Sequence, residues 1–288
     1  MISDITLGQF FPGKSCIHRL DPRTKIILTV LFIVSVFLAN SPLGFLLLTV
    51  GVATLVALSR LSFKLIIKGI KPIIFVLMFT ALINIFVTKG DGDPLVSFWI
   101  IKIYEEGLVR AFFMSFRVIL LIVGTSVLLT YTTSPITLTD GLENLMSPLK
   151  LIKIPVHVIA MMMTIALRFI PTLIEETEKI MNAQKSRGAD FSSGSLVKRA
   201  KALIPILVPL IISSFKRADE LAIAMECRCY RGDKNRTKLV KLTYRSLDAA
   251  WFIIGLLFIS SMIALMLAPK YLSDVVPENI SAVIFYKI

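Results

Sequence analysis

The chain has 288 residues, of which 56% are apolar or aromatic and only 18% are charged, and its mean hydropathy is +0.80. An ordinary soluble domain is about 45–50% apolar and about 25% charged, so this composition excludes a pair of soluble domains, a disordered chain and a disulfide scaffold. The net charge of +13 would indicate a nucleic-acid partner in a soluble protein, but in a membrane protein the placement of the charges matters more. The composition therefore predicts an all-α, polytopic membrane protein without a nucleic-acid partner.

Five apolar runs are long enough to cross a bilayer as helices, which need about 20 residues each. Residues 26–59 contain no charged side chain, but Asn40, Ser41 and Pro42 interrupt them, so we expect two helices joined by a tight turn. The runs are continuous and do not alternate, which favours helices over barrel strands. The expected spans are 26–39, 43–59, 72–88, 107–131 and 249–268.

The basic residues predict the orientation of these spans. Of the 32 Lys and Arg residues, 26 lie in segments 1–25, 60–71 and 132–248, whereas segments 89–110 and 269–288 hold five. Cytoplasmic loops carry an excess of Lys and Arg, so we expect a cytoplasmic N-terminus and an extracellular C-terminus. The first apolar run is not followed by a small-residue cleavage site, so we expect the first helix to be retained.

These boundaries divide the chain into five segments. The segment 132–248 holds 18 of the basic residues and is too long for a passive connection. All the cysteines fall in segments placed in the cytoplasm, where thiols stay reduced. We expect, in order, a cytoplasmic N-terminal segment (1–25), a membrane domain with helices one to four (26–131), a cytoplasmic domain (132–248), a last membrane helix (249–268) and an extracellular tail (269–288).

The cytoplasmic segment is expected to begin with a long helix after Pro155. Its apolar first part, Val156–Leu167, has too few residues to span a bilayer, so we interpret it as interfacial or buried. The second part is polar, and Glu175 and Lys179 have the favourable i,i+4 order. Gly188 is typical of a residue just past the last turn, so the helix should end there.

A second long helix follows the linker Ser192–Ser195, which offers a cap. It repeats the plan of the first, because an apolar half precedes a charged half that ends near Cys229. Pro205 and Pro209 lie in the apolar half, where we expect them to kink the helix.

Three local motifs resemble a nucleotide-binding loop, a zinc site and a cation site, but ordinary loops and helix ends explain them better. Residues 8–15 match the phosphate-loop pattern G-x-x-x-x-G-K-[ST], which needs a buried strand before it and a helix after it. The residues before the motif are too polar for a buried strand, and Pro22 limits any helix after it. We therefore predict a loop without a nucleotide site. Cys227 and Cys229 lack the spacing of a zinc site, and both histidines are distant in sequence. The turn Asp91–Asp93 is expected to be solvated, and it would hold a cation only weakly.

Arg117 is the one charged residue well inside an expected span, where it costs roughly 2.5–3.5 kcal/mol. It can reach the interface, pair within the bundle or face a partner, and the sequence leaves these alternatives open. None of the expected spans contains an acidic residue. Ion-coupled carriers usually need such an acid and often show inverted repeats, which argues against that class.

Two arginines, Arg187 and Arg228, stand at the expected ends of the two long helices, 41 positions apart. One explanation is a cation that stabilises a helix C-terminus by about 0.3–1 kcal/mol. The other is an arginine fork that docks into an acidic cleft with bidentate bonds. Small neighbours on either side of each arginine would let the backbone approach a partner closely.

Three stretches of the sequence resemble a known family. They are the opening, Gly8–Phe10 and His18–Lys25, and the paired signatures Ala183–Ala189 and Ala224–Tyr230. With them the chain resembles the transmembrane coupling protein (T component) of energy-coupling factor transporters, which is similar to the cobalt-uptake permeases. The resemblance extends over essentially the whole chain.

This sequence departs from the family at three signature positions. Ser186 and Cys227 replace the usual alanines, and Cys229 stands where glycine is frequent. Both arginines remain, so the expected docking role is kept. The end of the second helix is where we expect a local difference.

The resemblance implies about five membrane helices plus a cytoplasmic coupling domain of long crossed amphipathic helices, in a prokaryotic cell membrane. It implies two cytoplasmic ATPases, which hold the ATP and magnesium, and a membrane-embedded substrate-binding S component for a vitamin or metal ion. The chain itself would then be a non-catalytic coupling subunit without a cofactor. The residues implied in ATPase docking are Arg187, Arg228, Ser186, Gly188, Cys227, Cys229 and Glu226, and those in contact with the S component are Met161, Met162, Pro205 and Pro209.

Other functions compete with this one. A self-sufficient carrier or channel would move a solute without ATPases, and Arg117 is the residue that suggests it. A membrane enzyme would use Asp91 and Asp93 or the cysteines. A conventional ABC permease would form a two-fold dimer and bind the substrate itself.

Overall fold

The computed structural model describes residues 10–88, 96–98, 101–189, 191, 195–232 and 242–272. In this part of the chain, helices predominate, and one hairpin pairs β1 (Val96–Phe98) with β2 (Ile101–Ile103). Five of the described helical segments are long and apolar enough to cross a membrane. The predicted all-α, polytopic membrane protein is therefore confirmed.

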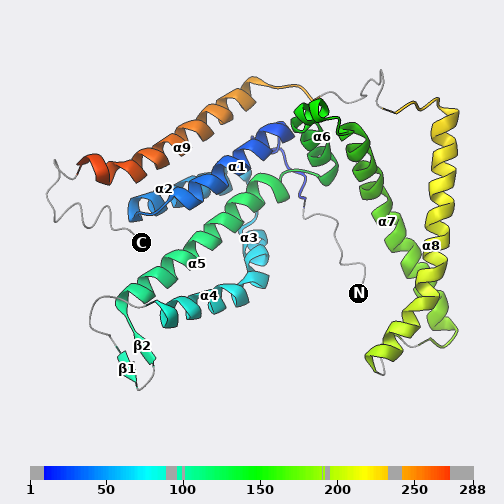
Figure 1. Cartoon of the computed structure of the whole chain (residues 1–288), viewed down its shortest axis with the longest axis horizontal. Helices are drawn as coiled ribbons and strands as arrows, with labels where there is room; N and C mark the ends of the chain where they lie inside the picture. The colour runs from blue at the N-terminus through cyan, green and yellow to red at the C-terminus, as the bar shows by residue number, and fades with distance from the viewer. Residues whose placement is uncertain are drawn as a thin grey trace. The chain divides into compact units, whose positions relative to one another are not determined.

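The chain forms two compact units (Figure 1). Gln9–Ser134 together with Leu242–Ile288 forms one, which we call the membrane unit. Pro135–Lys241 forms the other, which we call the insert unit because it interrupts the first in sequence.

In the membrane unit, α5 packs against α1, α2 and α4, and α9 packs against α1 and α2 (Figure 1). A π-helical turn, Ser126–Thr130, extends α5, and a 3₁₀ turn, Lys71–Ile73, joins α3 to α4. The helices are α1 (Pro22–Leu38), α2 (Pro42–Ser59), α3 (Phe63–Ile70), α4 (Ile74–Val87), α5 (Glu105–Thr125) and α9 (Ser246–Leu272).

The predicted break in the first apolar run is confirmed, because α1 ends at Leu38 and α2 begins at Pro42. The Ser41 side chain caps α2 by accepting a hydrogen bond from the Gly44 amide. At the other end, α1 begins four residues before the apolar run, because Asp21 caps it and Pro22 suits the first turn. The capping residues, and not the edge of the apolar run, therefore mark where this helix starts.

The third predicted span begins too late. Helical structure starts at Phe63 with α3 and continues through the 3₁₀ turn at Pro72 into α4. Lys64 and Lys68 interrupt the apolar pattern of α3, so hydropathy alone misses this helix. The turn follows from Pro72, which has no amide hydrogen and crowds the carbonyl four residues earlier.

The candidate spans differ from the expected set in one member. They are α2, Phe63–Val87, Glu105–Thr130, α7 (Val156–Ser186) and the α9 segment Ser246–Leu267. The first part of α7, Val156–Leu167, was expected to be too short to span a bilayer. Apolar residues continue beyond Arg168, however, so the whole helix is a candidate span by length and composition. By contrast α1 has only 17 residues, about 25 Å at 1.5 Å per residue.

The core of the membrane unit lies where α1, α2, α5 and α9 meet. Leu48, Val36, Val127 and Met262 are buried there almost completely. Gly124 of α5 lies against the Phe32 ring, which leaves no room for a side chain, so α1 and α5 approach closely. Many apolar side chains of α4 and α9 are exposed, as expected for helices that contact lipid.

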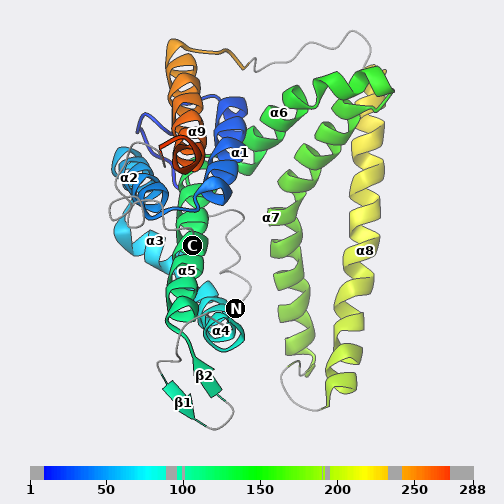
Figure 2. The same ribbon diagram turned by 60° about the vertical axis from the view of Figure 1, so that its left-hand side comes forward.

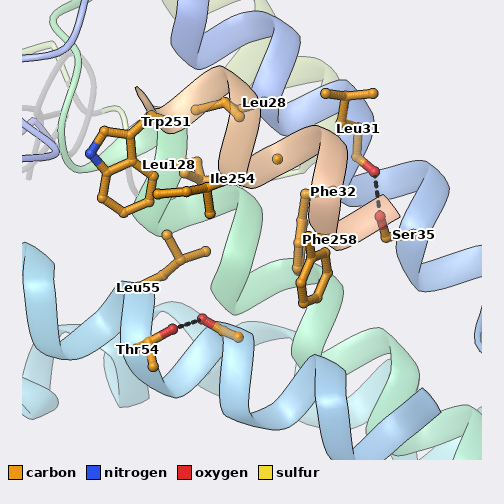
Figure 3. Close-up of a pocket in the computed structure, with 12 residues that line it drawn as sticks. Leu28, Leu31, Phe32, Ser35, Thr54, Leu55, Leu128, Trp251, Ile254 and Phe258 are labelled. Carbon is orange, nitrogen blue, oxygen red and sulfur yellow. Dashed lines mark hydrogen bonds between the residues drawn. The ribbon is translucent and has the colours of Figure 1, made fainter. Parts of the chain in front are cut away.

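An apolar pocket of about 120 Å³ opens between α1, α2 and α9 (Figure 3). Trp251, Phe258 and Leu55 are among its lining residues. The two hydroxyls in its wall, on Ser35 and Thr54, donate hydrogen bonds to carbonyl oxygens of their own helices. The surface of the pocket is therefore mainly apolar.

The insert unit consists of α6 (Pro135–Leu145), a 3₁₀ turn (Ser147–Ile152), α7 and α8 (Leu196–Cys227). In it α6 packs against α7, and α7 packs against α8 (Figure 2). The predicted linker is confirmed where it is described, since the Ser195 side chain caps α8 by accepting from the Lys198 amide. Pro205 and Pro209 lie inside α8, as the sequence places them.

Candidate functional site: two matching helix ends

The helix α7 ends in a Schellman motif. Gly188 adopts a left-handed conformation with a φ of 90°, and its amide donates to the Lys185 carbonyl at 2.9 Å. The Ala189 amide donates to the Gln184 carbonyl at 3.0 Å, which completes the motif. Arg187 is the capping residue, and its side chain is exposed. The predicted helix end is therefore confirmed to the residue.

The helix α8 ends in the same motif, shifted by the 41 positions that separate the arginines. The Cys229 amide donates to the Glu226 carbonyl at 2.8 Å, and the Tyr230 amide donates to the Met225 carbonyl at 3.0 Å. Arg228 is the capping residue and is exposed. The two ends thus share both the arginine and the backbone that carries it.

Cys229 adopts the left-handed conformation that Gly188 provides at the first end, with a φ of 56°. A side chain in this conformation costs roughly 1–2 kcal/mol. The departure from glycine therefore does not change how α8 ends. It places strain in the turn that presents Arg228.

The seven residues predicted for docking form two exposed clusters and do not form a single site. One cluster is Ser186, Arg187 and Gly188, and the other is Glu226 to Cys229. Within the described residues, neither arginine side chain makes an ion pair. Each cluster therefore presents a free cation on a well-formed turn, where a partner carboxylate can accept both guanidinium donors.

The helices α7 and α8 run antiparallel and contact each other through Glu176 of α7. Its carboxylate lies 2.6 Å from the guanidinium of Arg217 on α8. The Ser213 hydroxyl also donates to the Glu176 carboxylate. The sequence pattern gives no signal for this contact.

The contact lies at the same distance from the C-terminal ends of both helices. On α7, Arg187 follows Glu176 by 11 residues, and on α8, Arg228 follows Arg217 by 11 residues. At 1.5 Å per residue, each end extends about 16 Å from the contact, in opposite directions. Glu176 and Arg217 are also separated by the 41 positions that separate the two arginines, so they are equivalent positions of the two helices. The α7–α8 pair is therefore approximately two-fold symmetric about the Glu176–Arg217 contact.

An apolar groove of about 400 Å³ lies between α7 and α8 on one side of this contact. Met162, Phe169, Leu221 and Met225 are among the residues that line it. Of the four residues predicted to contact an S component, Met162 lines the groove and Met161 lies next to it in sequence. Pro205 and Pro209 lie on α8 beyond the groove and are exposed.

Arg117 has a structural partner within the membrane unit. Its guanidinium donates to the Ala39 carbonyl and to the Asn40 side chain, and it lies 5.2 Å from the Phe45 ring centre. These contacts hold the turn between α1 and α2 against α5. Of the alternatives that the sequence left open, pairing within the bundle is the one observed.

The part of the false phosphate loop that is described, Phe10–Ser15, belongs to an irregular segment. The Ser15 hydroxyl contacts His18 Nδ1 at 2.6 Å, and His18 Nε2 donates to the Phe11 carbonyl at 3.0 Å. The pKa of His18 is lowered, mainly because the ring is partly buried and also because the positive charge of Lys25 is near. The hydrogen bond to Phe11 raises this pKa and so opposes part of the shift. A neutral ring that accepts from Ser15 and donates to Phe11 satisfies both contacts.

No group of three potential metal ligands gathers among the residues that the structure describes. Cys227 and Cys229 are exposed free thiols. His157 contacts Glu143 at 2.9 Å and so joins α7 to α6. The predicted turn at Asp91 and Asp93 lies outside the described residues.

Residues 13–239 match the model of the cobalt transport protein family. The chain is 52% identical to the energy-coupling factor transporter transmembrane protein of Clostridium kluyveri over 267 residues, which cover 93% of this chain and 95% of that relative. The chain belongs to this family of energy-coupling factor transmembrane proteins. Family members of the same name from Ruminiclostridium cellulolyticum and Bacillus subtilis are 55% and 48% identical over 86% and 91% of this chain, and 92% and 98% of their own lengths.

Membership in the energy-coupling factor family makes the chain a transmembrane component of a transporter. The family match runs from the N-terminal segment through α8, so it includes both arginine ends. The resemblance drawn from the opening residues and the paired signatures is thereby confirmed.

Proposed function

We propose that this chain is the energy-coupling subunit of an energy-coupling factor importer. It would pass the ATP-driven motion of two cytoplasmic ATPases to an S component that binds a vitamin or metal ion. ATP and magnesium would be held by the ATPases, and this chain would be non-catalytic. The relatives' names describe transporter components, which supports the role in a transporter, and the geometry of the insert unit supports the coupling role.

The observation that carries the proposal is the matched pair of arginine ends. Arg187 and Arg228 stand on identical turns, at opposite ends of an antiparallel helix pair, at equal distances from its central contact. A local capping role would not require this correspondence. Two similar ATPases, each with one acidic groove, would receive such ends one apiece. Closure of the ATPase pair would then move both ends relative to the contact at Glu176.

The distribution of basic residues supports a cytoplasmic N-terminus and an extracellular C-terminus, with the insert unit in the cytoplasm of a prokaryotic cell. Although α7 is apolar enough to be a candidate span, we assign it to the cytoplasmic side. Its second half carries Glu175, Glu176 and Lys179, and it packs along α8, which is charged at both ends.

The apolar surfaces of the insert unit would contact the S component. Met161 and Met162 on α7 and Pro205 and Pro209 on α8 lie in the apolar halves of these helices. Methionine adapts to irregular partners because it is unbranched and flexible, which suits a subunit that supports another membrane protein. The groove beside Met162 offers an apolar site for such contact.

The proposal predicts that Arg187→Ala and Arg228→Ala each weaken ATPase docking by about 2–5 kcal/mol, the cost of truncating one member of a buried charged pair. Membrane insertion should not change, because both side chains lie exposed at helix ends. Co-purification of the ATPases with the tagged chain from native membranes measures the docking.

Arg168→Ala on α7 and Lys216→Ala on α8 are matched controls, since both residues are exposed cations on the same helices away from the ends. They should retain the ATPases. Normal recovery of the ATPases with both arginine variants would contradict the proposal. So would solute transport by the purified chain alone in vesicles, because that result would favour a self-sufficient carrier.

A further inference from the structure

The first turn of α1 contains a buried lysine in the membrane unit. Lys25 is 2% exposed, and its ammonium group donates to the Thr132 carbonyl at 2.8 Å and to the Thr133 hydroxyl at 3.2 Å. Both threonines are buried as well. They lie three and two positions before Pro135, where the insert unit begins in sequence. Lys25 therefore holds the chain at the point where it leaves the membrane unit.

The same turn also holds the chain where it returns. Asp248 in the first turn of α9 is 3% exposed, and its carboxylate accepts from the Asp21 amide at 2.7 Å and from the Arg245 amide at 2.8 Å. Arg245 and Asp248 lie four and seven positions after Lys241, the last residue of the insert unit. Asp21 is itself the residue that caps α1.

Arg23 adds a second contact on the return side. Its guanidinium donates to the Leu242 carbonyl at 3.5 Å and lies 5.1 Å from the ring centre of Tyr244. Asp21, Arg23 and Lys25 thus fall within five consecutive residues and contact both sequence neighbours of the insert unit. We call these three residues, with Asp248, the α1 clamp.

Burial of charges at this position needs a reason beyond packing. The Lys25 ammonium is held by oxygens of Thr132, Thr133 and His18, and Asp21 and Asp248 are buried in the same cluster. A buried charged or polar group that loses its hydrogen-bond partners is left unsatisfied, which is unfavourable. These bonds therefore impose a specific arrangement on the segments that make them. A cluster that fixes two chain segments to one helix turn suits a joint that must not slip.

We propose that the α1 clamp is the joint through which motion of the insert unit reaches the membrane helices, with Lys25 and Asp248 as positioning residues. The inference rests on the proposed function. On the leaving side, Thr132 and Thr133 are held by this turn of α1, and α6 begins at Pro135, so only one residue separates the held segment from a displaced α6. The displacement is delivered to α1, and through it to α5 and α9, which pack against α1.

The test compares Lys25→Met with the wild type in the transporter purified with its partners in lipid nanodiscs. Hydrogen–deuterium exchange is measured with ADP and with ATP, magnesium and vanadate. In the wild type, exchange should differ between the two nucleotide states in the insert unit and in α5 and α9. In the variant, the difference should persist in the insert unit and fall about tenfold in α5 and α9, the factor for one lost hydrogen bond to a buried charge.

A purely structural role for Lys25 predicts another result, in which exchange rises equally in both nucleotide states and their difference is kept. That result overturns the inference. Lys14→Met, an exposed lysine of the same segment, is the control and should behave as the wild type. If Lys25→Met does not assemble, Thr133→Val and Asp248→Asn test the same joint with smaller changes in shape. A wild type without any nucleotide-dependent change in the insert unit would contradict the proposed function, and the inference would fail with it.

Discussion

At the scale of single residues, the two arginine ends differ in one respect that matters energetically. Gly188 and Cys229 occupy the same left-handed position, but only glycine adopts it without strain. The position beside Gly188 is open, since nothing lies within 4 Å of where its Cβ would be. Any penalty for a side chain there comes from the backbone conformation and not from a clash.

This difference predicts that Cys229→Gly stabilises the last turn of α8 by about 1 kcal/mol, because it removes the strain of a side chain in the left-handed region. Gly188→Ala should destabilise the last turn of α7 by a similar amount. Hydrogen exchange of the terminal amides of each helix reports the local opening, and a change of about 1 kcal/mol alters exchange roughly five-fold.

The control for this prediction is Cys227→Gly, which makes the same substitution two residues earlier. Cys227 is the last residue of the helix proper, where glycine is unfavourable by about 1 kcal/mol. Opposite signs at positions 227 and 229 are therefore expected. Equal effects at both positions would show that removal of the thiol, and not the backbone, decides the outcome.

At the scale of helices, the ends could be predicted from sequence because the signals are local. Ser41, Ser195 and Gly188 act through hydrogen bonds to residues three positions away. The start of α3 was missed because its lysines hide a helix from a hydropathy criterion. The contact between Glu176 and Arg217 could not be predicted, since nothing in the sequence indicates which exposed carboxylate meets which arginine across two helices.

The Glu176–Arg217 contact predicts a measurable coupling between α7 and α8. In a double-mutant cycle with Glu176→Gln and Arg217→Gln, we expect a coupling free energy of about 0.5–1 kcal/mol, since both side chains are partly exposed. Thermal unfolding of the purified chain in detergent gives the four stabilities required. The cycle tests whether the Glu176–Arg217 contact holds α7 against α8 at the centre of their symmetric arrangement.

Glu175 and Lys179 supply the comparison cycle on the same helix. Both are exposed, and an i,i+4 pair of this kind contributes about 0.3–0.5 kcal/mol at most. A coupling at Glu176 no larger than that of this local pair would mean that the contact does not hold α7 against α8. The symmetric geometry would then need another source of stability.

At the scale of the whole molecule, composition predicted a polytopic helical protein, which is confirmed, and the Lys and Arg distribution predicts an orientation that stays a prediction. The sequence did not predict the α1 clamp, because Lys25 and Thr132 are 107 positions apart and both belong to segments that look like ordinary helix ends. Length and apolarity also cannot separate α7 from a membrane helix. The sidedness of the insert unit is thus the property on which the proposed function most depends.

The native cysteines test that sidedness without mutation. Cys16, Cys227 and Cys229 are all exposed free thiols, and all three are expected on the cytoplasmic side. A membrane-impermeant maleimide should therefore label the chain in inside-out vesicles and leave it unlabelled in right-side-out vesicles. Bound ATPases should protect Cys227 and Cys229, which flank Arg228, while Cys16 stays reactive and serves as the internal control. Labelling of Cys227 or Cys229 from the outside would contradict the orientation, and equal labelling with and without the ATPases would contradict docking at the α8 end.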